Sequence, residues 1–243
     1  GVTGFEGMDV ALALRPEKLA IDRNEPEQPH NKVRGIIEDI AYFGSHSVYH
    51  VRLASGKKLM VNTFSLVGLK SDVDFLLWRV GPTLEPLQAM SGAVRQTAMA
   101  GYLSMPYSYL SMTKRSTYVD KLDPDHQDKR RFITPAKSKY LFVYPFVKTR
   151  DWYQIPFEQR QTMMDEHIRV GNKYPSVRLH TTYSFGLDDQ EFVVAFETDH
   201  PQDFLDLVQE LRGTKGSVYT LRDTPIFTCV AKPFGEILKG MGG

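Results

Sequence analysis

The stretch YLFVYPFVKTRDWYQIPFEQRQTMMDEHIRVG, residues 140–171, is the most informative about the fold of this chain. Residues 140–148 are rich in aromatic and β-branched side chains, which predicts a strand. From Pro156 to Val170 apolar residues recur at helical spacing, which predicts an amphipathic helix. A helix that folds back on the preceding strand places the inward side chains of both in one core.

Three side chains of this stretch suit a haem site. Helical spacing puts His167 on one stripe with Val170, where a neutral imidazole can ligate haem iron. Strand alternation puts Tyr144 and Lys148 on one face with Phe146, so that a redox-competent phenol lies beside a cation that can hold a carboxylate. The alternative is a packed histidine, a core tyrosine and a surface lysine.

An internal repeat extends this stretch into a fold. Residues 68–78 (GLKSDVDFLLW) resemble residues 186–196 (GLDDQEFVVAF). Each copy predicts a hairpin followed by a helix, with apolar positions Leu84, Leu87 and Val94 in the first and Phe204, Leu205, Val208 and Leu211 in the second. Each then predicts another strand, within 107–118 and 218–230. The sequence therefore predicts an α+β fold of ferredoxin-like repeats, in which only the second copy has the leading strand and helix.

The N-terminal part has another character. Residues 8–62 alternate apolar and polar positions between turn signals, which predicts a small antiparallel β unit ending near residue 62. We therefore expect a β segment at 1–62, an incomplete N-terminal ferredoxin-like half at 63–120 and a C-terminal half at 139–243. The polar residues 121–139 are expected to form a solvated linker.

The composition and net charge of the chain argue against several classes of protein. A net charge of +1 and a pI near 8.0 give no field that would attract nucleic acid. The single cysteine, Cys229, excludes an intrachain disulfide and fits a reducing compartment, so we expect a cytoplasmic protein. No apolar run is long enough for a membrane span, and residues 1–18 lack the order of a signal peptide.

Further residues are candidates for binding an acidic ligand. Arg131 and Arg222, with Arg130, Lys114 and Arg115, could pair with carboxylates through bidentate or single contacts. The alternative for each of these residues, considered singly, is an ordinary charged side chain on the surface. Trp152 is a candidate cofactor contact whose alternative is a core position.

Residues 63–232 resemble the chlorite dismutase and coproheme decarboxylase superfamily, most specifically through residues 144–178, and are most similar to the actinobacterial-type decarboxylases. The resemblance implies a dimeric α+β barrel, often homopentameric, that holds haem or coproheme in its C-terminal half. It also implies an enzyme that uses hydrogen peroxide to decarboxylate two propionates of coproheme III, giving haem b through a three-propionate intermediate.

Carried over by position, His167 matches the proximal iron ligand. Tyr144 matches the tyrosine that becomes a radical and attacks a propionate, and Lys148 matches the lysine that holds one. Coproheme would then be both substrate and redox centre, with Trp152, Leu179, Arg131 and Arg222 as further binding residues.

Departures from the family pattern separate its subfamilies. Leu179 stands where chlorite dismutases have a distal arginine, and Gly216 where they have a glutamate behind the proximal histidine, which disfavours chlorite chemistry. The distal base of the decarboxylases aligns with Thr113. His180 could replace it only if its strand turned inward, whereas alternation sends it away from Leu179.

Residues 8–62 resemble instead a TOBE domain of polyamine-type transport ATP-binding subunits. A natural fusion and a misassembled reading frame both fit this resemblance. Two other functions therefore stand beside the decarboxylase: a haem-binding protein or weak peroxidase without decarboxylation, and a transport-associated binding module.

Overall fold

A computed structural model describes residues 35–42, 47–53, 60–119, 133, 135 and 138–242. The chain divides into two compact units, of which the first comprises Gly1–Thr63, Leu77–Met105 and Lys232–Gly243 and the second Phe64–Leu76 and Pro106–Ala231. In the described part of the chain, no helix has the length and apolar character needed to cross a membrane.

The first unit contains a β-hairpin and helices. Strands β1 (Gly35–Tyr42) and β2 (Ser47–Leu53) pair antiparallel, as expected for this part of the predicted β unit, while residues 8–34 lie outside the described residues. The remaining elements are α1 (Leu84–Arg95), the 3₁₀-helix η2 (Ala98–Tyr102) and α6 (Phe234–Gly240). Strands β3 (Met60–Ser65) and β4 (Phe75–Val80) belong partly to each unit.

The second unit is built on an antiparallel sheet. The strand order of the whole sheet is β4-β3-β9-β5-β7-β6, with β8 paired to β5. Its strands are β5 (Tyr140–Lys148), β6 (Arg178–Tyr183), β7 (Phe192–Thr198), β8 (Thr220–Arg222) and β9 (Phe227–Ala231). Its helices are α3 (Arg150–Gln154), α4 (Phe157–Gly171), α5 (Pro201–Arg212) and the 3₁₀-helix η3 (Lys215–Tyr219). The predicted leading strand and helix are thus β5 and α4.

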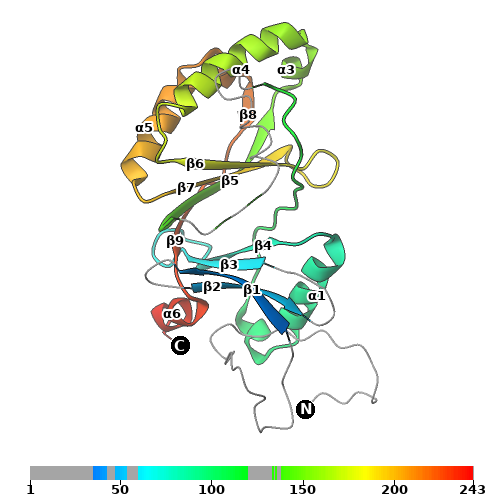
Figure 1. The fold of residues 1–243 in the computed structure, drawn as a ribbon, viewed down its shortest axis with the longest axis vertical. Helices are drawn as coiled ribbons and strands as arrows, with labels where there is room; N and C mark the ends of the chain where they lie inside the picture. The colour runs from blue at the N-terminus through cyan, green and yellow to red at the C-terminus, as the bar shows by residue number, and fades with distance from the viewer. Residues whose placement is uncertain are drawn as a thin grey trace. The chain divides into compact units, whose positions relative to one another are not determined.

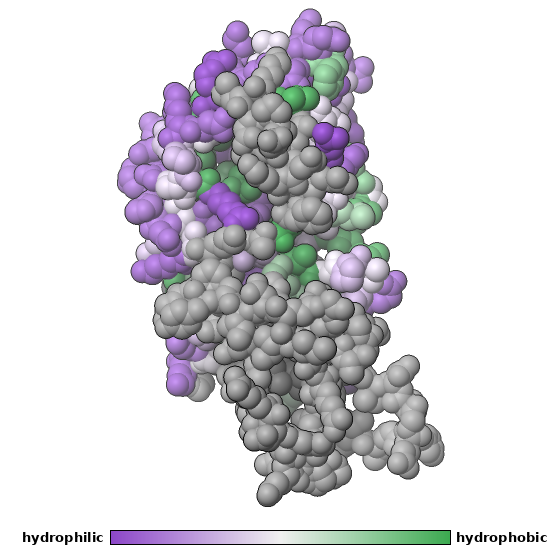
Figure 2. Space-filling view, in the orientation of Figure 1, coloured by the Kyte–Doolittle hydropathy of each residue, from purple (hydrophilic) through white to green (hydrophobic). Residues whose placement is uncertain are grey.

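Helices α4 and α5 cover the same face of this sheet (Figure 1). The core between them consists of Phe142 and Phe196 from the sheet, Val170 from α4, and Phe204 and Leu207 from α5. The rings of Phe142 and Phe204 stack with centroids 4.0 Å apart. Hydrophilic side chains cover the side of the molecule on which α4 and α5 lie (Figure 2).

One predicted core position of α5 is wrong. Leu205 is 55 % exposed, whereas Leu207 is 4 % exposed and takes part in the core. The sheet-facing side of α5 is therefore the stripe of Phe204, Leu207, Val208 and Leu211.

The repeat is confirmed in atomic detail at its two hairpin turns. Gly68 and Gly186 occupy equivalent places, with φ of 75° and 72°, in the left-handed region that glycine adopts without steric cost. Comparable backbone hydrogen bonds close both turns, although the first turn is one residue longer than the second. Leu66 N–H donates to Asp74 O over 2.7 Å, and Ser184 N–H donates to Glu191 O over 2.8 Å.

The strand expected within residues 107–118 is not formed. Only Met112 makes a β-bridge, to Tyr183. Side chains satisfy the neighbouring backbone instead: Leu110 N–H donates to Asp188 Oδ2 over 2.7 Å, and its carbonyl accepts the Ser184 hydroxyl over 2.7 Å. These bonds take groups that a strand ladder would use, so apart from the bridge at Met112 this segment adds no strand to the sheet.

Candidate functional site

Tyr144 lies in the middle of β5, opposite Val194 of β7. Its ring is stacked at 5.9 Å from that of Phe196 and packs against the core that α4 and α5 complete. The prediction that Tyr144 faces the helices is therefore confirmed. Burial raises the pKa of its phenol well above the ordinary value of 10.0, with a smaller contribution from Asp223, so the hydroxyl keeps its proton at neutral pH.

His167 lies on the inward side of α4, between two residues whose surroundings fix that side. Met163, one turn earlier, is close to η3, since a Cβ on Gly216 would lie 3.9 Å from the Met163 Cβ. Val170, one turn later, is buried in the core against which Tyr144 packs. Side chains at these spacings share a helix face, so the imidazole belongs to the same layer of the molecule as the phenol.

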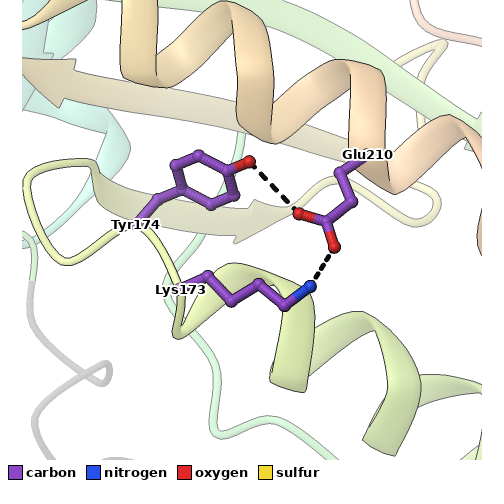
Figure 3. A network of polar contacts seen from close by, with 3 residues as sticks. All are labelled: Lys173, Tyr174 and Glu210. Atoms are coloured by element: carbon purple, nitrogen blue, oxygen red, sulfur yellow. Dashed lines mark hydrogen bonds and ion pairs between the residues drawn. The ribbon is translucent and has the colours of Figure 1, made fainter.

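The end of α4 that follows His167 is tied to α5 by a small polar network (Figure 3). The Tyr174 hydroxyl donates to Glu210 Oε2 over 3.1 Å, and Lys173 forms an ion pair with the other carboxylate oxygen. Because Glu210 belongs to α5, this contact joins the two helices that cover the site face of the sheet.

Lys148 ends β5 at a register irregularity between Val147 and Lys148. Its ammonium donates to Gly216 O over 2.6 Å and lies 4.6 Å from the Trp152 ring centroid and 5.3 Å from that of Phe146. The predicted sharing of one strand face with Phe146 is thus confirmed. Burial lowers the pKa of Lys148 to about 8, and the charge of Glu191 partly opposes that change.

Trp152 of α3 is only 3 % exposed. It supports the lysine ammonium on one side and lies 5.6 Å from the Tyr219 ring on another. A tryptophan face attracts a cation through its quadrupole, so Trp152 serves here as a platform for Lys148.

Sequence reasoning missed two residues of this site, Glu191 and Tyr153. Glu191 Oε2 accepts the backbone N–H of Lys148 over 2.8 Å and the hydroxyl of Tyr153 over 2.6 Å. Both residues stand within the quoted motifs, but no local spacing links Glu191 to a strand that ends 43 residues earlier.

The predicted arginines lie elsewhere or outside the described residues. Arg222 belongs to β8, opposite Val147, and its guanidinium donates to Asp189 O over 3.5 Å, in the turn between β6 and β7. Arg131, the other carboxylate partner expected from the sequence, lies outside the described residues together with Arg130.

Leu179 and His180 lie on opposite faces of β6, as strand alternation predicts. Leu179 packs against the same core as Tyr144. His180 points away from it and forms a buried contact of 2.8 Å between its Nε2 and Glu197 Oε2. Thr113, the position aligned with the distal base, is exposed.

The fold and the site together define an α+β protein of ferredoxin-like repeats, with a phenol, an imidazole and a lysine gathered on the helix-covered face of one sheet. The chlorite dismutase family profile matches residues 34–232. This chain belongs to the chlorite dismutase family. The match includes the expected 63–232 and extends further toward the N-terminus, into the segment that resembles a TOBE domain.

Several known proteins are similar to this chain in sequence or in fold. A coproheme decarboxylase of Mycolicibacterium smegmatis is 31 % identical over 167 residues, which cover 68 % of this chain and 70 % of the relative. A chlorite dismutase mutant from Candidatus Nitrospira defluvii superimposes with a TM-score of 0.69 at 26 % identity, covering 78 % of this chain and 81 % of the other. A haem-binding protein from Thermus thermophilus has a TM-score of 0.66 at 26 % identity and 77 % coverage of each chain.

Proposed function

We propose that this protein is a coproheme decarboxylase, which uses hydrogen peroxide to convert two propionates of coproheme III into the vinyl groups of haem b. The observation that carries the proposal is the placement of Tyr144. A protonated, partly buried phenol shares its layer with the helix-borne His167, and Lys148 follows it on the same strand face. The kinship with coproheme decarboxylases supports the same reaction.

The residues present fit an iron porphyrin. The inward stripe of α4 offers one imidazole, which suffices as the protein ligand of a haem iron. The layer around Tyr144 is apolar, with Leu179, Val194 and Leu211 against the core, as a porphyrin face requires. Lys148 supplies a cation for a propionate, because its ammonium has three donors and Gly216 O accepts one of them. His167 would hold the iron, and Lys148 would orient the carboxylate.

The reaction needs an oxidant and a hydrogen acceptor at each propionate. For each group, R–CH₂CH₂–COO⁻, H₂O₂ and H⁺ give R–CH=CH₂, CO₂ and two H₂O. The iron porphyrin supplies the oxidising chemistry when it is bound. Tyr144 contributes a hydroxyl that stays protonated, because burial disfavours the phenolate, so its oxidation releases an electron together with a proton.

A second candidate function, haem binding or weak peroxidase activity without decarboxylation, has one observation in its favour. Neither position considered for the distal base is suited to it, since Thr113 is exposed and His180 is bound to Glu197 on the other face of β6. A decarboxylase would then need its base from another residue.

The test is anaerobic titration of the protein with ferric coproheme, followed by stepwise hydrogen peroxide and mass analysis of the porphyrin. We expect a bound Soret band and loss of two carboxyl groups through a three-propionate intermediate. Tyr144→Phe should bind coproheme and abolish turnover, since it removes only the hydroxyl. Tyr102→Phe, the same change at a tyrosine that is 91 % exposed, is the matched control and should keep activity.

Either of two results would contradict the decarboxylase: full turnover by Tyr144→Phe, or a stable Soret band with no change of porphyrin mass. The second result would favour the non-decarboxylating function. No Soret band, combined with binding to a transporter subunit, would favour the transport-associated module suggested by residues 8–62.

The proposal extends to assembly, location and the remaining residues. We propose a cytoplasmic homopentamer, on the family resemblance and the single buried cysteine, and native mass spectrometry of the purified protein tests the subunit number. Arg131 and Arg222 are proposed as further carboxylate partners and Trp152 as a cofactor contact. The domain limits 1–62, 63–120 and 139–243 also stay proposals.

A further inference from the structure

Glu191 is bound at the base of the Lys148 side chain. Its Oε2 accepts the Lys148 backbone N–H over 2.8 Å, and its own N–H donates to Phe146 O over 3.2 Å. These bonds span the point where the register of β5 shifts, between Val147 and Lys148. Glu191, which is half-buried and directly precedes β7, therefore fixes the backbone at Lys148.

Tyr153 holds the same carboxylate from the other side. Its hydroxyl donates to Glu191 Oε2 over 2.6 Å. Burial and this bond both raise the pKa of the phenol above its ordinary value, so it stays a donor at neutral pH. Because Trp152 precedes Tyr153 in α3, one helix supplies both the platform under the ammonium and the clamp on the acid.

At the other end of Lys148 the ammonium is bound to Gly216 O over 2.6 Å. This acceptor is a neutral carbonyl, and the Glu191 carboxylate is bound at the lysine backbone. A ligand carboxylate can approach the remaining donors of the ammonium without displacing the acid.

We propose that Glu191, clamped by Tyr153, is a positioning residue for Lys148: it fixes the lysine backbone and supplies the negative charge that keeps the ammonium protonated for a carboxylate of the ligand. This inference rests on the proposed function in so far as that ligand is coproheme. It assigns Glu191 no contact with the porphyrin.

The charge part of this role follows from the surroundings of Lys148. Burial lowers its pKa to about 8, and the Glu191 charge is the influence that raises it. The elements around it carry further charged or titratable side chains: Arg150 and Asp151 of α3; Glu158, Arg160, Asp165, Glu166, His167 and Arg169 of α4; Lys215 and Tyr219 of η3; and Arg222 of β8. Replacing Glu191 by glutamine removes one charge and keeps an oxygen that can accept both hydrogen bonds.

The first measurement needs no porphyrin. The protein is labelled with an amine-reactive reagent at a series of pH values, and the Lys148 peptide is quantified by mass spectrometry. In Glu191→Gln we expect the midpoint of Lys148 labelling to move about one pH unit toward acid, the lower end of the effect of a neighbouring charge. Asp74→Asn is the matched control, since Asp74 enters β4 as Glu191 enters β7, and it should leave the midpoint unchanged.

The second measurement is the pH dependence of the coproheme Kd. Glu191→Gln should match the wild type near pH 6, where Lys148 is charged in both proteins, and bind about fivefold more weakly near pH 8. In a Lys148→Arg background the same substitution should lose this pH dependence, because a guanidinium stays charged. Lost packing alone would weaken binding equally at every pH.

Tyr153→Phe separates the two proposed roles of Glu191, which are to fix the Lys148 backbone and to supply a negative charge. It is also the variant to use if Glu191→Gln does not fold. It leaves the carboxylate but removes its clamp, so hydrogen exchange of the Lys148 amide should become faster while the labelling midpoint stays near that of the wild type. Unchanged exchange in this variant, or an unchanged midpoint or Kd profile in Glu191→Gln, would overturn the inference. Failure of the wild type to bind coproheme would instead overturn the proposed function and leave the labelling result standing.

Discussion

The two copies of the repeat share a scaffold and differ in what is attached to it. In the first copy, β3 and β4 are joined by the turn at Gly68 and followed by α1 and η2. In the second, β6 and β7 are joined by the turn at Gly186 and followed by α5 and η3. The second copy is also preceded by β5 and α4, and these two elements carry Tyr144, Lys148 and His167.

If the proposed function holds, the chemistry belongs to the elements that only the second copy has. The hairpin and helix are formed twice from similar sequence, and the proposed catalytic residues and iron ligand lie outside both, while the expected binding residue Leu179 lies in the second hairpin. Glu191 illustrates the change of role. Its backbone carbonyl closes the turn as that of Asp74 does in the first copy, while its carboxylate is also used by Lys148 and Tyr153.

The largest expected effect tests whether the second copy is the better packed. Phe204 and Leu87 occupy equivalent places in α5 and α1, but Phe204 is buried in a stacked pair and Leu87 is half-buried. We expect Phe204→Ala to lower the free energy of unfolding by about 3–5 kcal/mol and Leu87→Ala by clearly less. Urea unfolding of both variants measures this, and equal losses would contradict the proposed difference in packing.

The next effect tests whether burying Lys148 at the site lowers the free energy of unfolding. The pKa of Lys148 falls from 10.5 to about 8 on folding, so the unfolded chain binds more protons between these pH values and stability rises with pH there. Lys148→Met should therefore be more stable than the wild type near neutral pH, by about 3 kcal/mol at most, with the advantage disappearing as pH rises through this range. Urea midpoints across the range measure it, and a constant difference would rule out this interpretation.

The smallest effect tests the likeness of the two turns. A Cβ on either Gly68 or Gly186 would meet no atom within 4 Å, so alanine costs only the strain of a positive φ. We expect Gly68→Ala and Gly186→Ala each to lower the free energy of unfolding by about 1–2 kcal/mol. Thermal unfolding of the pair checks this, and clearly unequal losses would mean that the turns are not equivalent.

The local and periodic features of this protein could be predicted from its sequence alone. Alternation placed Tyr144 and Lys148 on one strand face and His180 away from Leu179, and helical spacing placed His167 on the stripe of Val170. The repeat was visible because each copy closes its own hairpin with a glycine of positive φ. Such features depend on neighbours within a few residues, which a sequence displays directly.

The features that depend on distant partners emerged only in the folded chain. Glu191 reaches Lys148 and Tyr153 across 43 and 38 residues, and Asp188 holds Leu110 across 78. The last contact also explains why the strand expected within 107–118 is absent. The way α5 packs on the sheet buries Leu207 and leaves Leu205 exposed. Hydrogen bonds and packing contacts between remote segments produce no recognisable residue pattern in the sequence, because they form only when folding brings those segments together.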